Sequence, residues 1–207
     1  MNPHARSTRR QFLTLGGAGA LLMQAPAGFA VEAKANTPAW PGGNDYQRSV
    51  RSYTIPDVEL IDSDARPVRL RELLSSDEPV MLNFIFTTCS TICPVMVRVF
   101  SDVPSRLGAA SKDLRMISIS IDPENDTPAR LRTYAKSFGE GLRWRFLTGR
   151  VQDIKSVQMA FDSYRGDKMA HEPLTLIRQG RGKTWLRIDG FANPDELASE
   201  YRRIAAR

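Results

Sequence analysis

The sequence predicts an α/β domain in which a central sheet is flanked by helices. Residues 80–86 and 114–121 are almost continuously apolar, as strands buried on both faces of a sheet are. A helical pattern follows each of them, and strands and helices alternate to the end of the chain. The 207 residues, 42% hydrophobic and 25% charged, have an ordinary globular composition, which excludes a disordered or collagen-like protein.

The expected elements follow one another regularly from residue 57. Residues 57–61 alternate between polar and apolar side chains, as a strand does. Residues 62–65 fit a turn, and residues 68–70 fit a second strand after it. Residues 71–74 fit a single helical turn. The remaining expected strands are 80–86, 114–121, 142–147, 174–177 and 185–188, and the remaining expected helices are 95–107, 127–138, 151–161 and 194–204.

The helix expected at residues 127–138 has the clearest ends. Thr127 can cap it, because a threonine hydroxyl accepts a hydrogen bond from the first helical turn. Pro128 suits the first helical position, where no backbone N–H is needed. Gly139 follows the last apolar residue and is a typical stop signal.

Residues 1–30 are predicted to be an export signal. Three arginines lie in the first ten positions, and residues 11–31 carry no charge. Residues 8–13, Thr-Arg-Arg-Gln-Phe-Leu, resemble the twin-arginine signal, and small residues before positions 28 and 31 offer cleavage points. The resemblance implies delivery to the periplasm of a bacterium. An uncleaved membrane anchor with a basic flank is the alternative, in which the signal would be the protein's only membrane contact.

Residues 31–53 are expected to be a flexible tether, because proline and glycine interrupt any regular period there. The working domain is therefore expected to span residues 54–207. The net charge of the whole chain is +6, and it falls to +3 without the three arginines of the signal. So modest a balance does not favour a nucleic-acid partner.

The only two cysteines, Cys89 and Cys93, directly follow the apolar stretch 80–86. Ligand sites of α/β sheets gather at the carboxyl ends of such strands. Pro94 suits the first turn of a helix, so Cys93 is expected at or beside a helix N-terminus, whose partial positive charge favours a thiolate. A four-residue offset in a helical turn brings the Cα atoms within about 6 Å, close enough for a disulfide or for two sulfurs on one soft metal ion. Two purely structural cysteines are the alternative, and a many-bridged secreted scaffold is excluded.

His171 is the third candidate residue. The other histidine, His4, lies in the predicted signal, so His171 would be the only histidine of the mature protein. Two thiolates and one imidazole suit copper, with Cu(I) on the sulfurs and Cu(II) bound by the histidine as well. A structural zinc ion would usually have four protein ligands. An ordinary solvated loop histidine is the alternative, which spacing alone does not exclude.

Three features together resemble the Sco/SenC family of copper chaperones. Residues 83–96, Asn-Phe-Ile-Phe-Thr-Thr-Cys-Ser-Thr-Ile-Cys-Pro-Val-Met, are similar to the CxxxCP site of that family. Residues 118–128, Ser-Ile-Ser-Ile-Asp-Pro-Glu-Asn-Asp-Thr-Pro, are similar to its second signature, and His171 falls where the family places its third copper ligand. The resemblance covers residues 53–206. It implies a thioredoxin-like fold, copper bound through Cys89, Cys93 and His171, and a part in building the copper centre of cytochrome c oxidase.

One departure from the family pattern concerns the histidine, since many members have an aspartate directly before it, whereas Ala170 stands here. Beyond the three proposed ligands, the segments that carry the resemblance hold further polar or sulfur-bearing side chains. Five of them could support the site or serve only local structure and packing: Asp122, Glu124, Asp126, Met96 and Met169.

Two functions of different classes are open on this evidence. The first is a periplasmic copper chaperone that passes copper by ligand exchange to the copper-bearing subunit of cytochrome c oxidase. The second is a periplasmic thiol–disulfide oxidoreductase that keeps the cysteines of that subunit, or of other copper or thiol proteins, reduced. Three residues separate Cys89 from Cys93, whereas thioredoxin-type enzymes have two, and this favours metal binding.

Overall fold

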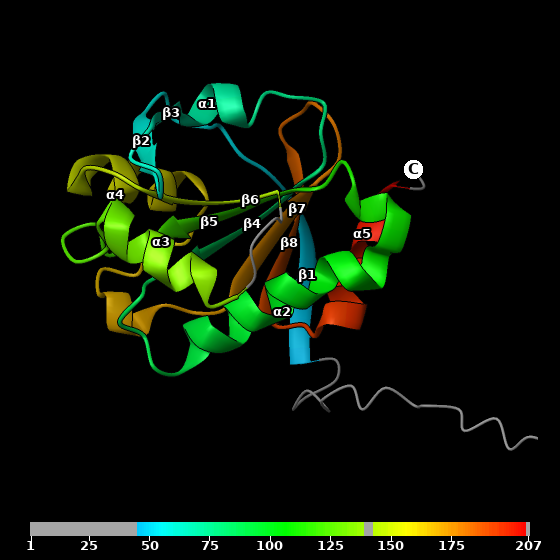
Figure 1. The fold of residues 1–207 in the computed structure, drawn as a ribbon. Coiled ribbons are helices and arrows are strands. Elements are labelled where there is room, and N and C mark those ends of the chain that lie inside the picture. The colour runs from blue at the N-terminus through cyan, green and yellow to red at the C-terminus, as the bar shows by residue number, and fades with distance from the viewer. Residues whose placement is uncertain (1–44, 139–142, 206–207) are drawn as a thin grey trace, which may run out of the picture. The chain divides into compact units, whose positions relative to one another are not determined.

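The computed structural model describes residues 45–138 and 143–205, which belong to one compact unit (Figure 1). A mixed eight-stranded sheet has the order β1-β8-β7-β4-β5-β6-β2-β3. Its strands are β1 Asp45–Ser52, β2 Glu59–Asp62, β3 Pro67–Arg69, β4 Val80–Ile85, β5 Arg115–Ser120, β6 Trp144–Thr148, β7 Leu174–Arg178 and β8 Thr184–Phe191. The helices are α1 Leu70–Leu73, α2 Ile92–Leu107, α3 Pro128–Lys136, α4 Val151–Ala160 and α5 Pro194–Ala205, with 3-10 turns η1 Gly108–Ser111 and η2 Lys168–Ala170. The predicted α/β class and the alternation of elements are confirmed.

Local signals in the sequence place the start of α3 correctly, whereas the helix ends at Lys136, two residues before its expected end, and the expected stop signal Gly139 lies outside the described residues. The Thr127 hydroxyl accepts a hydrogen bond from the backbone N–H of Arg130, and Pro128 is the first helical residue. Helix α2 begins at Ile92, three residues before its expected start. The helix therefore includes Cys93, as the position of Pro94 indicated.

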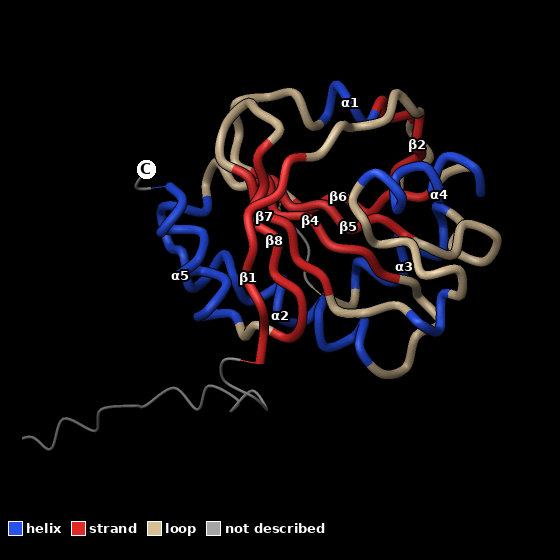
Figure 2. The backbone as a smooth tube through the Cα atoms, turned by 180° about the vertical axis from the view of Figure 1, so that it is seen from behind, coloured by secondary structure: helices blue, strands red, loops and turns tan. Residues whose placement is uncertain are grey.

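The central strand β4 explains where the two cysteines lie. All six of its side chains are buried, as its unbroken apolar run predicts. It pairs in parallel with β5, from Val80 opposite Arg115 to Ile85 opposite Ser120, and β5 pairs in parallel with β6. The loops that follow β4 and β5 consequently leave the sheet at the same end, where the carboxyl ends of the two strands lie side by side. Figure 2 shows these strands side by side from behind.

Two apolar layers cover the two faces of the sheet, because successive residues of a strand point to opposite faces. On one face, α1 and α4 enclose a cluster that includes Leu70, Leu73, Phe84, Ile154, Val157 and Phe161. On the other face, α2 and α5 lie side by side over Val99, Phe100, Val103, Met116, Leu197 and Tyr201 (Figure 1). A third, smaller cluster lies at the start of α2 and contains Ile85, Phe86, Cys93, Val97, Leu131 and Phe146.

The expected tether is wrong over part of its length. Residues 45–52 form β1, an edge strand that pairs antiparallel with β8 from Asp45 opposite Phe191 to Ser52 opposite Thr184. The strand also contacts α5, because the Arg48 guanidinium lies 3.1 Å from the buried carboxylate of Glu200. The described domain thus begins before residue 54. The expected signal, residues 1–30, and the rest of the expected tether, residues 31–44, lie outside the described residues.

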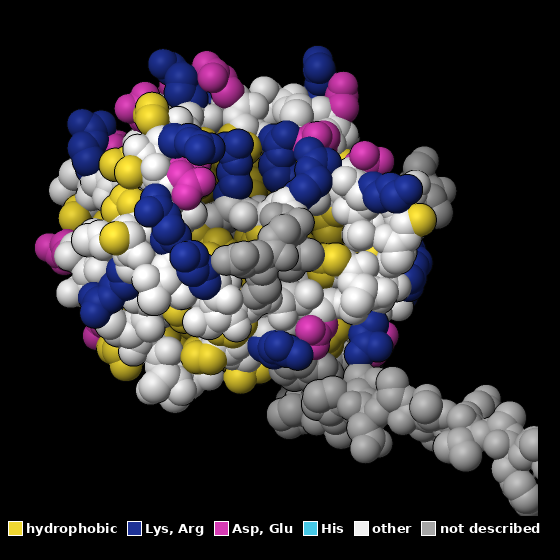
Figure 3. Space-filling model, in the orientation of Figure 1, with side chains coloured by type: hydrophobic (Ala, Val, Ile, Leu, Met, Phe, Trp, Pro, Cys, Tyr) yellow, Lys and Arg dark blue, Asp and Glu magenta, His cyan; other side chains and the backbone are white. Residues whose placement is uncertain are grey.

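Charges of both signs are mixed on the surface of this domain. On the face in Figure 3, Lys and Arg side chains lie among Asp and Glu side chains, most densely in the upper half near α1. Within residues 45–138 and 143–205, no helix is both long and apolar enough to cross a membrane.

Candidate metal centre

A buried carboxylate fixes the loop that carries the first cysteine. Asp126 is fully buried after β5, and it accepts hydrogen bonds from the backbone N–H of Thr87 (3.1 Å) and from the hydroxyl of Ser120 (2.6 Å). The Thr87 hydroxyl also donates to the same carboxylate. Asp126 therefore ties the end of β4 to the end of β5. The backbone N–H of Cys89 then closes a turn onto the carbonyl of Phe86 (3.2 Å).

The structure brings Cys89 and Cys93 together but exposes them unequally. Cys93 is the second residue of α2 and is fully buried, whereas Cys89 is partly exposed just before the helix. The backbone N–H of Cys93 donates to the Cys89 sulfur over 3.5 Å, and the hydroxyl of Thr91 lies 3.6 Å from that sulfur. Both thiols are free. The expected placement at the carboxyl end of a strand and the start of a helix is confirmed.

This arrangement gives the two thiols different pKa values. Burial alone would raise the pKa of Cys89, but hydrogen bonds from the backbone N–H groups of Cys93 and Thr91 and from the Thr91 hydroxyl outweigh it and lower the pKa to about 7. Burial raises the pKa of Cys93 to about 12, and the neighbouring Cys89 sulfur adds to the shift. At neutral pH the pair therefore offers one accessible thiolate beside one buried thiol.

We expect Cys89 to be alkylated by iodoacetamide in the folded, reduced protein while Cys93 is not. Only the thiolate reacts, so the rate should rise about tenfold per pH unit below pH 7 and level off above it. Peptide mapping by mass spectrometry across a pH series measures this, with Cys89→Ser as the control that should show no labelling. A rate that still rises between pH 8 and 9 would mean that Cys89 is an ordinary thiol.

His171 is held against the backbone of β4. It follows η2, is mostly buried, and its Nε2 lies 3.0 Å from the carbonyl oxygen of Phe84. Because a carbonyl only accepts, Nε2 carries the proton of the neutral ring and Nδ1 keeps its lone pair. Burial lowers the pKa of His171 by more than the hydrogen bond to Phe84 raises it, so the ring stays neutral and able to bind metal at pH 7.

No group of three or more His, Cys, Asp or Glu side chains within residues 45–138 and 143–205 is close enough to hold a metal ion. The loop that carries His171 is nevertheless docked next to the cysteine loop. Lys168 forms a 2.6 Å ion pair with buried Asp122, and its Nζ lies 5.8 Å from the centre of the Phe86 ring. His171 as third ligand thus stays a prediction, in which Nδ1 would bind the metal while Nε2–H stays on the Phe84 carbonyl.

The other candidate side chains have separate roles. Asp126 and Asp122 hold the two loops that flank the thiols, as described above, whereas Glu124 is exposed. Met96 is buried in the packing of α2, and Met169 is 74% exposed beside His171.

Sequence reasoning missed Tyr134 on α3. Its hydroxyl is buried and makes no hydrogen bond to any described residue, and its ring packs in the cluster that contains Cys93. Tyr134 and Cys89 both pack against the cluster that contains Cys93. Burial raises the pKa of Tyr134, and the charges of Cys93 and Cys89 raise it further. An unpartnered donor beside two thiols fits a site that gains negative charge, as it does when both sulfurs are deprotonated to bind a soft metal ion. The three-residue spacing from buried Leu131 was the available signal in the sequence.

The chain is similar to several known proteins. Residues 46–206 match the family model described as SCO1/SenC. The SCO1 protein homolog of Bacillus subtilis is 30% identical over 161 residues, which cover 73% of this chain and 82% of that protein.

Two solved structures show a similar fold. BsSco, described as a member of the Sco family of cytochrome c oxidase assembly proteins in which a disulfide switch was identified, is 29% identical, with a TM-score of 0.62 over 75% of this chain and 95% of that one. Bradyrhizobium japonicum ScoI with copper bound is 25% identical, with a TM-score of 0.57 over 73% of this chain and 99% of that one. These likenesses confirm the predicted thioredoxin-like arrangement of a sheet flanked by helices.

Proposed function

The chain belongs to the SCO1/SenC family, and from that premise we propose that it is a periplasmic copper chaperone serving cytochrome c oxidase. Copper is its cargo, held by the sulfurs of Cys89 and Cys93 with His171 as the third ligand. The observation that carries this proposal is the thiol pair at the start of α2, with one sulfur ionised near neutral pH and the other buried. Two thiolates form a soft ligand set that suits Cu(I), and an added imidazole suits Cu(II).

Known relatives support both parts of the proposal. Bradyrhizobium japonicum ScoI was solved with copper bound, and BsSco is described as belonging to a family of cytochrome c oxidase assembly proteins. In this chain, copper would pass to the oxidase subunit by ligand exchange, in which incoming thiolates replace the three ligands one at a time. The buried Tyr134 hydroxyl would donate a hydrogen bond to a sulfur while copper is bound.

Deletion of this chain from its native host tests the delivery role. We expect loss of cytochrome c oxidase activity and of copper in the oxidase, because the apo subunit no longer receives the ion. Wild type should restore both, and the Cys89→Ser variant should restore neither. The matched control is Ser90→Ala, which changes an exposed neighbour in the same loop and should restore both. Full oxidase activity in the deletion strain would contradict the proposal.

The unequal acidity of the thiols favours one second candidate, a thiol–disulfide reductase. The Cys89 thiolate would attack a target disulfide, forming a mixed disulfide and releasing one target thiolate. Cys93 would then lose its proton and attack the Cys89 sulfur, which oxidises the pair to a disulfide and leaves the target with two thiols. A Cys93→Ser variant should trap the mixed disulfide if this reaction occurs. A trapped oxidase subunit together with normal oxidase copper in that strain would favour this candidate over delivery.

We further propose that the twin-arginine signal carries the chain to the periplasm. Replacing Arg9 and Arg10 by lysine should keep the protein in the cytoplasm, because this export route selects for the arginine pair. In wild type, intact-mass analysis of the periplasmic fraction should show a chain that begins at residue 28 or 31. Continued export of the lysine variant would show that another signal is used.

A further inference from the structure

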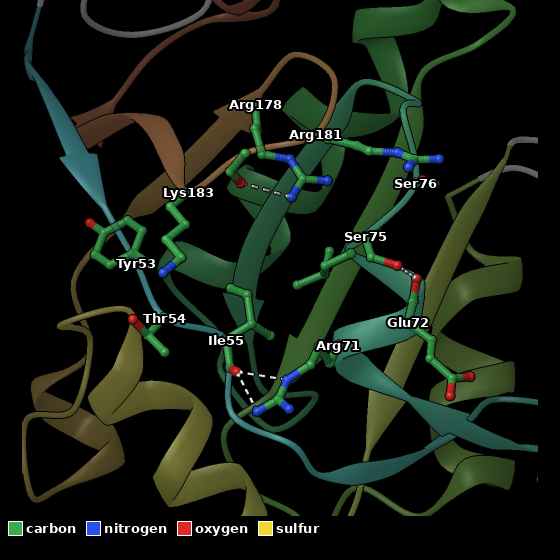
Figure 4. Close-up of a pocket in the computed structure, with 12 residues that line it drawn as sticks. Tyr53, Thr54, Ile55, Arg71, Glu72, Ser75, Ser76, Arg178, Arg181 and Lys183 are labelled. Carbon is green, nitrogen blue, oxygen red and sulfur yellow. Dashed lines mark hydrogen bonds between the residues drawn. The ribbon is translucent and has the colours of Figure 1, made fainter.

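A cavity of about 610 Å³ opens at one end of the central strands (Figure 4), and the thiols lie at the other end. The register of the strands fixes this position, because Arg178 of β7 pairs with Val80, the first residue of β4, whereas Cys89 follows the last. The cavity is lined by the segment that follows β1, by α1 and the loop that follows it in the sequence, and by the hairpin that joins β7 to β8. The cavity is therefore distinct from the candidate metal centre.

A buried and unpaired guanidinium forms one wall of this cavity. Arg178 is 3% exposed, and its Nη1 donates a hydrogen bond to the carbonyl oxygen of Gly182 (3.3 Å). Among the residues that the structure describes, its Nε and Nη2 have no hydrogen-bond partner and no carboxylate pairs with it. The guanidinium lies over the ring of Trp185, 4.9 Å from the ring centre. A charge that is buried without a counter-ion destabilises a protein, so this one calls for an anion from outside the chain.

The cavity has a surplus of positive charge besides Arg178. Figure 4 shows Arg178 and Lys183 projecting from the hairpin toward the open space above Ile55. Lys183 forms no ion pair with any described residue. Arg71 and Arg181 also line the cavity, but they are already paired with Asp57 and Asp77 outside it.

The single acidic residue of the lining does not neutralise these cations. The carboxylate of Glu72 turns away from Arg178 and Lys183 in Figure 4, and it lies 3.3 Å from the guanidinium of Arg69. Burial lowers the pKa of Arg178, and repulsion by Arg115 lowers it further, as expected of a cation that lacks a partner.

The rest of the lining is suited to an apolar group. Tyr53, Ile55 and Leu74 contribute ring and aliphatic surface beside the two cations. The volume falls within the range of about 300–1,000 Å³ that is usual for small-molecule sites, which combine an apolar lining with a few convergent polar groups.

We propose that this cavity binds an organic anion, whose carboxylate or phosphate group contacts Arg178 and Lys183 and whose apolar body packs against Tyr53, Ile55 and Leu74. A guanidinium with two free N–H groups matches the paired oxygens of either group. This binding site is independent of copper and of the thiols.

The proposal is tested by titrating small organic molecules into the full-length protein, with the NMR signals of the indole N–H groups as the measure of binding. The indole N–H of Trp185 is buried, lacks a partner and lies under Arg178, so a bound anion should shift its signal. The indole N–H of Trp144 donates to Ser118 (3.0 Å) in another part of the sheet and is the internal reference. The probes are phenyl phosphate, 3-phenylpropionate, inorganic phosphate and the neutral 3-phenylpropanamide.

We expect both organic anions to shift the Trp185 signal, inorganic phosphate to bind more weakly than phenyl phosphate, and the amide to have no effect. The first two probes distinguish a phosphate ligand from a carboxylate ligand by affinity. No saturable shift of Trp185 by either organic anion up to about 10 mM would overturn the proposal. Equal binding of the amide would overturn it as well, because the charge would then play no part.

Two substitutions and a matched control locate the site. Lys183→Gln should weaken phenyl phosphate binding about three- to tenfold, because it removes one charged contact from an exposed position. Lys112→Gln removes the same charge from an exposed lysine outside the cavity lining and should leave the affinity unchanged. Equal weakening by both variants would show a general effect of net charge and overturn the proposal.

Arg178→Met should reduce binding at least tenfold, since it removes the group that contacts the anion. It should leave the melting temperature of the ligand-free protein unchanged or raised, because it removes an unpaired buried charge. If Arg178→Met lowers the melting temperature while the affinity for phenyl phosphate is kept, Arg178 has a structural role only and the proposal is wrong.

Discussion

Replacing either Cys89 or Cys93 by serine is expected to abolish tight copper binding, from one ion per chain in the reduced wild type to none. A soft ion needs two convergent thiolates, and a serine hydroxyl is a hard donor that stays protonated at neutral pH. The loss should exceed the 10–100-fold in affinity that is typical when a residue merely supporting a metal ligand is removed. Copper per chain after competition with a Cu(I) chelator measures it.

The serine variants need a control that separates ligand loss from damage to the loop. Ser90 lies between the cysteines at an exposed position, so the Ser90→Ala variant should keep one tightly bound copper ion. Cys93 is buried, so its variant should also be checked by thermal unfolding. If the double cysteine variant keeps stoichiometric tight copper, the site lies elsewhere in the chain.

His171→Ala is expected to weaken Cu(II) binding at least 10–100-fold and Cu(I) binding far less. Imidazole is the harder ligand, and Cu(I) can remain on two sulfurs, whereas Cu(II) needs the additional nitrogen. The reduction potential of the Cys89–Cys93 pair should change little, because the histidine takes no covalent part in disulfide exchange. Equilibrium titrations with each oxidation state, and the loss of sulfur charge-transfer absorption by Cu(II), measure these effects.

The exposed neighbour Glu172 provides the matched control for this experiment. Its carboxylate pairs with Arg165 (3.1 Å), so Glu172→Gln alters the same loop without touching the imidazole, and Cu(II) affinity should persist. Unchanged Cu(II) binding by His171→Ala would remove His171 from the site. Its contact with the carbonyl of Phe84 would then be its whole role, seen as a loss of stability.

Local sequence signals account for most of the fold. Strand β4 was predictable because a fully apolar run fits a strand buried on both faces, and α3 because Thr127 and Pro128 act on their immediate neighbours. Strand β1 was not predictable in this way. Its residues Gln47 and Val50 are exposed, and it is held by backbone pairing with a strand about 140 positions later and by the contact of Arg48 with Glu200.

The site could be predicted only in part, because some of its contacts join residues that are far apart in the sequence. The position of the two cysteines follows from the strand before them and the proline after them. The support of Thr87 by Asp126 joins residues 39 positions apart, and the lack of a partner for the Tyr134 hydroxyl exists only in three dimensions. For His171, the family resemblance supplied a role that the residue's spacing could not, and its position on the Phe84 carbonyl became visible only in the structure.

If this chain transfers copper as proposed, the unequal exposure of its two sulfurs fixes the order in which the copper bonds exchange. A donor or acceptor protein can reach the pair only from the side of Cys89, because α2 and its neighbours cover Cys93 completely. The bond to Cys89 is then the first to be exchanged when copper leaves, and the bond to Cys93 is the last. Loading would run through the same steps in reverse, with Cys93 the first sulfur to bind the incoming ion and Cys89 the last, as the donor protein releases it.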